Sequence, residues 1–79
     1  MKYIREQDVE GKRMGPPHQR VIRDLVTPEN MGIKNMAMDT TSIDPGFSSN
    51  AHSHEAAEEI FYCLSGRGRI MVDDEEMPL

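Results

Sequence analysis

Cys63 is the only cysteine among 79 residues, so no disulfide can form within the chain. A chain of this length buries only about 60% of the surface that its unfolded form exposes. Chains of this size usually need disulfides, a metal ion or a partner subunit to become stable. Because a disulfide is excluded, a bound metal ion or a second subunit remains. A single cysteine is also typical of a reducing compartment, and we expect the protein to be cytoplasmic.

The charge balance limits the classes of partner. Fourteen acidic residues against nine basic ones give a formal net charge of -5, and the basic residues are scattered along the sequence. Such a chain would be repelled by a phosphate backbone. No apolar stretch approaches the roughly 18 residues of a membrane span, and residues 1–15 lack the apolar centre of a secretory signal. We therefore expect neither a nucleic acid nor a membrane as a partner.

Alternating side chains predict a fold made of β-strands. Residues 1–17 are polar and broken by glycine and proline, which predicts an N-terminal arm without a core element. The remaining residues, 18–79, form the predicted domain. Within it, branched residues predict a strand over 20–26, and Pro, Asn and Gly predict a loop over 27–32. A period-two pattern then predicts a strand over 33–43.

The second half of the sequence contains the signals of further strands and turns. Pro45 and Gly46 suit the two central positions of a type II turn. Aromatic and branched residues predict a strand over 58–64 after a short loop. A further strand is predicted over 69–72, followed by a tight turn at residues 73–74 and the start of a return strand.

Residues 50–66, NAHSHEAAEEIFYCLSG, hold two histidines and a carboxylate at a suggestive spacing. His52 and His54 would share one face of a strand, whereas on a helix they would diverge by about 200°. If the strand headed by Glu59 folds back beside them, its carboxylate meets both imidazoles. Two neutral nitrogens and one anionic oxygen leave coordination positions open, and they suit Fe, Mn, Ni, Cu or Zn.

Neighbouring residues have less specific roles. HEAAE has the spacing of a helical zinc-protease motif, but Glu58 stands where that motif needs histidine. Glu58 would point away from the site. We expect Cys63 to be a small buried core residue. We expect packing roles for four methionines: Met31, Met36, Met38 and Met71.

These residues resemble the first signature motif of the cupin superfamily. Five residues separate Gly46 from His52, and one separates His52 from His54. Four residues separate His54 from Glu59, and six separate Glu59 from Gly66. Pro45 and the stretch FYCLSGRGRIMVDDE are also similar to small single-domain cupins. The resemblance covers residues 33–79 and, more loosely, 20–32. It implies an all-β jelly-roll barrel or sandwich in which His52, His54 and Glu59 are ligands of a divalent transition metal.

Cupins carry a second motif, whose further histidine supplies a fourth ligand and whose place here would lie beyond Leu79. One explanation is a minimal cupin, a truncated jelly-roll completed by dimerisation, since open sheet edges invite strand pairing with a second copy. Another is that the chain is a fragment of a longer cupin. A third is a three-ligand site with His18 or water in the vacant position. We favour the homodimer.

The resemblance implies a range of functions because one fold supports many chemistries. The preferred expectation is a small metal-binding cupin, acting as a metal-dependent oxygenase or isomerase on a small-molecule ligand if it is an enzyme. No second catalytic group is evident in the sequence. The alternatives are a non-catalytic binding or sensing module and a fragment of a larger cupin enzyme.

Overall fold

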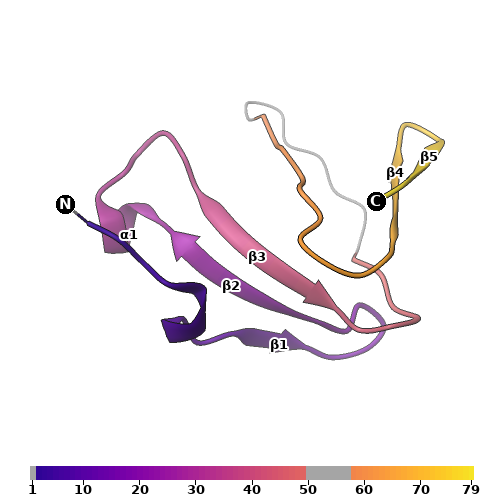
Figure 1. Cartoon of the computed structure of the whole chain (residues 1–79), viewed down its shortest axis with the longest axis horizontal. Coiled ribbons are helices and arrows are strands. Elements are labelled where there is room, and N and C mark those ends of the chain that lie inside the picture. Colours follow the sequence, from indigo (N-terminus) through magenta and orange to yellow (C-terminus); the bar gives the residue numbers. More distant parts are fainter. Residues whose placement is uncertain (1, 50–57) are drawn as a thin grey trace.

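The structure is a computed structural model that describes residues 2–49 and 58–79. Five strands and two single-turn helices make up the described part (Figure 1). In chain order the elements are η1 (Glu6–Asp8), β1 (Lys12–Met14), β2 (Arg20–Val26), α1 (Pro28–Met31), β3 (Met38–Ile43), β4 (Arg69–Val72) and β5 (Glu75–Pro78). The predominance of strands confirms the all-β expectation.

Strand β2 is the centre of an antiparallel three-stranded sheet with the order β1-β2-β3. Ile22 pairs with Lys12 on one side and with Thr41 on the other. The pairing with β3 is interrupted by a bulge between Asp24 and Val26. Leu25, at this bulge, is the one buried hydrophobic residue in the part of the chain that the structure describes. The strand predicted over 20–26 is confirmed with the same bounds.

One prediction about this sheet is wrong in its bounds, and another is extended by a short strand. The strand predicted over 33–43 begins only at Met38, because β2 ends at Val26, opposite Met38, and offers no ladder partner to earlier residues. The arm predicted over 1–17 also contains β1, a three-residue edge strand. All three residues of β1 are exposed, so this strand extends the sheet without adding to the core.

A helical turn occupies the segment that was predicted to be a loop over 27–32. The Thr27 hydroxyl accepts a hydrogen bond from the Asn30 backbone N–H at 3.2 Å, and the Asn30 side-chain oxygen accepts one from the Thr27 N–H at 2.8 Å. This reciprocal cap satisfies donors that a helix start leaves unpaired. Pro28 opens α1, and Gly32, at φ 68°, ends it. Lys2 reaches the end of α1 and donates to the Met31 carbonyl.

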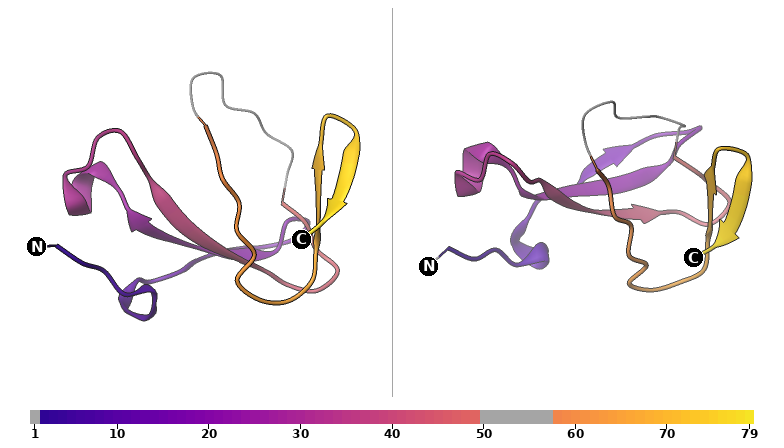
Figure 2. Two further views of the ribbon diagram at one scale, coloured as in Figure 1. Left: turned by 45° about the horizontal axis from the view of Figure 1, so that its top comes forward. Right: turned by 90° about the horizontal axis from the view of Figure 1, so that it is seen from above.

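Strands β4 and β5 form an antiparallel hairpin apart from the first sheet. Its turn is Asp73 and Asp74, with φ of 48° and 69°, the left-handed conformation that a two-residue hairpin turn requires. Both strands and the turn confirm the sequence prediction. The hairpin stands beyond one end of the three-stranded sheet (Figure 2). The described strands thus form two sheets, not one barrel wall.

Candidate metal site and its surroundings

The predicted turn before the histidines is present. Pro45 and Gly46 are its central residues, Gly46 has φ 84°, and the Phe47 N–H donates to the Asp44 carbonyl at 3.1 Å. These values match the predicted type II turn, in which the third residue needs a positive φ. The turn reverses the chain at the end of β3 and leads it toward the histidine segment.

Of the three predicted metal ligands, the structure describes Glu59. Its side chain is exposed, as is that of Glu58 beside it. His52 and His54 lie outside the described residues, so the predicted approach of the carboxylate to both imidazoles stays a prediction. Within residues 2–49 and 58–79, no group of three or more His, Cys, Asp or Glu side chains is placed to hold a metal ion.

The strand predicted over 58–64 is wrong for this structure. No strand is assigned there, and within the described part of the chain no backbone hydrogen bond joins this segment to another element. A strand needs a neighbour to satisfy its N–H and C=O groups, whatever its side-chain pattern. For the same reason Cys63 is exposed and not buried as predicted; its thiol donates weakly to the Ser65 carbonyl at 3.4 Å.

The predicted packing of the methionines is also not realised at three of the four positions. Met36, Met38 and Met71 are each more than half exposed, whereas Met31 is partly covered. Met38 begins β3 and Met71 belongs to β4, and each of these strands lies at a sheet edge. An edge strand in an uncovered sheet leaves such side chains in solvent.

His18 is the protein residue that the sequence offers as a fourth metal ligand. It contacts the chain just before the histidine segment. Its Nδ1 lies 2.8 Å from the backbone oxygen of Ser48. Ser48 precedes His52 by four positions and follows the Asp44 turn. The contact therefore joins the segment just before β2 to the chain that precedes the predicted ligands. His18 is half-buried.

A polar cluster beside His18 was not predicted. The Asp44 carboxylate accepts hydrogen bonds from the Gln19 side-chain amide and from Arg13 Nη1, the latter at 3.2 Å. The hydrogen bond from Gln19, then that from Arg13, holds the pKa of Asp44 below its usual value of 3.8. Arg13, Gln19 and Asp44 are far apart in sequence and meet through the register of the sheet. A local sequence pattern therefore predicts that Asp44 begins a turn but not which residues it contacts.

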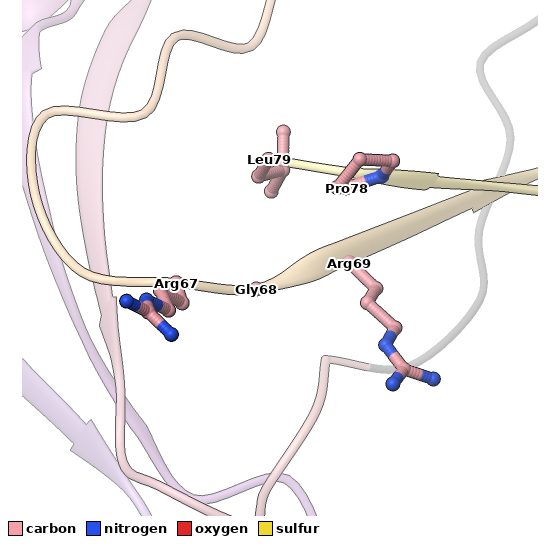
Figure 3. Close-up of a pocket in the computed structure, with 5 residues that line it drawn as sticks. All are labelled: Arg67, Gly68, Arg69, Pro78 and Leu79. Atoms are coloured by element: carbon pink, nitrogen blue, oxygen red, sulfur yellow. The ribbon is translucent and has the colours of Figure 1, made fainter.

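The hairpin base carries an open surface hollow. It is lined by Arg67, Gly68, Arg69, Pro78 and Leu79. Figure 3 shows the two arginine side chains extending away from Leu79. Arg69 Nη1 also pairs with Glu76 at 2.9 Å across the hairpin. The Arg69 charge is thus partly balanced by this carboxylate.

Comparisons with known proteins agree with the motif. A family model described as "Cupin domain" matches residues 40–79. A curated relative, "Polyketide synthase CurC" from Streptomyces cyaneus, is 31% identical over 81 residues, covering 100% of this chain and 53% of the relative. The chain thus spans about half the length of the curated relative it matches. No solved structure matches the chain significantly. In the described residues, no helix has the length and apolar character needed to cross a bilayer.

Proposed function

The chain belongs to the cupin family, and on this basis we propose that it binds a divalent transition metal through His52, His54 and Glu59. The observation that carries the proposal is the family match over residues 40–79, which includes all three residues. The donor set fits such an ion, because two imidazoles and one carboxylate are typical ligands of Fe, Mn, Ni, Cu or Zn.

The substrate class that we propose is a small molecule bearing a 1,3-dicarbonyl group. The related protein from Streptomyces cyaneus is described as a polyketide synthase, and polyketide intermediates carry such groups. A bound divalent metal would supply Lewis-acid or dioxygen chemistry. His52, His54 and Glu59 would hold the ion, and its Lewis acidity would favour binding of a 1,3-dicarbonyl ligand. We also propose that the protein is cytoplasmic, because a single cysteine is typical of a reducing compartment.

The metal site is tested by elemental analysis of protein purified without added metal. We expect about one metal ion per chain in the unchanged protein and a loss of at least tenfold in occupancy in His52→Ala and Glu59→Gln. Glu58→Gln is the matched control, because it changes a neighbouring exposed carboxylate and should keep the metal. Absence of stoichiometric metal, together with unchanged stability in His52→Ala, would refute the proposed site.

The activity is tested separately with acetylacetone, a simple 1,3-diketone, as the probe. Turnover that requires both the metal and Glu59 supports an enzyme that acts as an oxygenase or isomerase. Metal-dependent binding of the probe without turnover favours the alternative of a non-catalytic binding or sensing module. A metal-loaded protein that neither binds nor converts the probe contradicts the proposed substrate class but leaves the metal site standing.

A further inference from the structure

We propose that His18 is a positioning residue for the predicted metal site, because its ring fixes the chain before His52 to the three-stranded sheet. The His18 Nδ1 donates to the backbone oxygen of Ser48 at 2.8 Å, a contact between residues 30 positions apart in sequence. This role rests on the proposed function, since it concerns metal binding by His52, His54 and Glu59. His18 would act through Ser48 and not through a bond to the ion.

The backbone around His18 is itself fixed to the sheet. The His18 carbonyl accepts a hydrogen bond from Arg20 Nη1 at 3.0 Å, and Arg20 is the first residue of β2. The next residue, Gln19, accepts a hydrogen bond from the Asp44 N–H at 3.4 Å and donates from its side chain to the Asp44 carboxylate. His18, Gln19 and Arg20 are all half-buried. The position of His18 is thus held independently of the contact between its ring and Ser48.

The contact shortens the free chain that leads to the first predicted ligand. Three residues lie between Ser48 and His52. In the part of the chain that the structure describes, the preceding hydrogen-bonded contact with residues 13–19 is at Asp44, and seven residues lie between Asp44 and His52. Each backbone residue that binding must order costs conformational entropy, and a segment held in advance binds more tightly. Loss of the His18 contact should therefore weaken metal binding.

Two roles of the imidazole use different atoms, which allows a substitution to separate them. The contact with Ser48 uses Nδ1, whereas a bond to the ion would use Nε2. Asparagine has an N–H donor attached to Cγ, as histidine has at Nδ1, but it has no nitrogen in place of Nε2. His18→Asn therefore keeps the hydrogen bond to Ser48 and removes the alternative metal ligand. His18→Ala removes both.

Zn(II) affinity of the full chain, measured by competition with a chromogenic chelator, tests the role of His18. Zn(II) is a suitable probe because sites of this kind bind it more tightly than Mn(II) or Fe(II). We expect His18→Ala to raise the Kd by about fivefold, as loss of one hydrogen bond predicts, and His18→Asn to stay within about twofold of the unchanged protein. Gly11→Ala is the matched control. It strains the same sheet at Val21, away from Ser48, and should leave the Kd unchanged.

The outcomes separate the role of His18 from the metal site itself. Equal Zn(II) affinity of His18→Ala and the unchanged protein would refute the positioning role and leave the metal site standing. If His18→Asn binds Zn(II) as weakly as His18→Ala does, His18 acts through Nε2 as a ligand and the positioning role is wrong. Absence of Zn(II) binding by the unchanged protein would overturn both the metal site and the role of His18.

Amide hydrogen exchange of the metal-free protein tests the same contact when His18→Ala lowers the overall stability. The N–H groups of Asp44 and Phe47 donate to the carbonyls of Gln19 and Asp44, next to the contact. We expect their exchange to be about threefold faster in His18→Ala than in His18→Asn, with the amides of the β4–β5 hairpin unchanged. Equal exchange in the two variants, or uniform acceleration throughout the chain, would show that His18 does not hold this segment and would overturn the proposal.

Discussion

Gly11 has no room for a side chain, because residues of strand β2 lie close to its Cα atom. A Cβ atom at this position would collide with Cγ1 of Val21 and lie 3.3 Å from the Arg23 guanidinium carbon. Val21 is β-branched and stiff at χ1, so it cannot easily turn away. Gly11 therefore permits the chain before β1 to approach β2 closely. Gly15, in contrast, has open space where its Cβ would lie.

We predict that Gly11→Ala destabilises the protein by about 1–3 kcal/mol, the usual cost of forcing extra atoms into a close contact. Gly15→Ala is the matched control and should change the free energy of unfolding by less than about 0.5 kcal/mol. Denaturant unfolding followed by circular dichroism measures both. Equal stability of the two variants would mean that the chain before β1 moves away from Val21 without cost.

At the scale of elements, Asp44 joins three parts of the first sheet. Arg13 comes from β1, Gln19 precedes β2, and Asp44 follows β3. The Asp44 N–H also donates to the Gln19 carbonyl at 3.4 Å. One carboxylate thus connects the same end of all three strands, next to the turn that leads toward the predicted metal ligands.

This arrangement predicts a pH dependence. The pKa of Asp44 is lower in the folded chain than its usual value of 3.8 because Gln19 and Arg13 donate to the charged form. The folded chain therefore prefers ionised Asp44, and the resulting stability is present above about pH 4 and is lost as pH falls through the lowered pKa. Thermal unfolding between pH 2 and 6 should show a steeper loss for the unchanged protein than for Asp44→Asn.

Asp74→Asn is the control for this pH profile, because asparagine also suits its left-handed backbone conformation. It should follow the profile of the unchanged protein. If Asp44→Asn loses stability in acid as steeply as the unchanged protein does, the three-strand connection at Asp44 contributes nothing to acid sensitivity.

The elements also show what the sequence alone can predict. Strand β2 and the β4–β5 hairpin were predicted because their side-chain patterns and the Asp73–Asp74 turn act locally. The segment 58–64 has an equally strong pattern but forms no strand, since pairing depends on a neighbour and not on pattern. Helix α1 was missed because its cap uses Asn30 where the usual capping box has Glu or Gln.

The candidate site was predictable to a similar, limited extent. The Gly46 turn followed from residue chemistry and is confirmed. The contacts of His18 with Ser48 and of Arg13 with Asp44 join residues about thirty positions apart. Such contacts arise from sheet register, which a single sequence specifies only weakly.

At the scale of the whole molecule, few side chains are buried among residues 2–49 and 58–79, so we expect the stability of the fold to depend on what the chain binds. A ligand that binds only the folded state stabilises it by RT ln(1 + [L]/Kd), which is about 2.7 kcal/mol at a hundredfold excess over Kd. We therefore predict that removing metal with EDTA lowers the unfolding temperature by several degrees and that adding back the metal restores it.

Variants of the two adjacent carboxylates provide the control for this effect. Glu58→Gln should retain the metal-dependent shift in unfolding temperature, whereas Glu59→Gln should lose it. Differential scanning fluorimetry with and without EDTA measures the shift. An identical shift in both variants would mean that the metal binds elsewhere on the molecule.

The contact between His18 and Ser48 has one more consequence. A backbone carbonyl oxygen only accepts hydrogen bonds, so the neutral imidazole must carry its proton on Nδ1. This selects one tautomer and leaves the lone pair on Nε2, the nitrogen that then acts as base or ligand. The contact with Ser48 therefore selects, in the neutral ring, the tautomer with its proton on Nδ1.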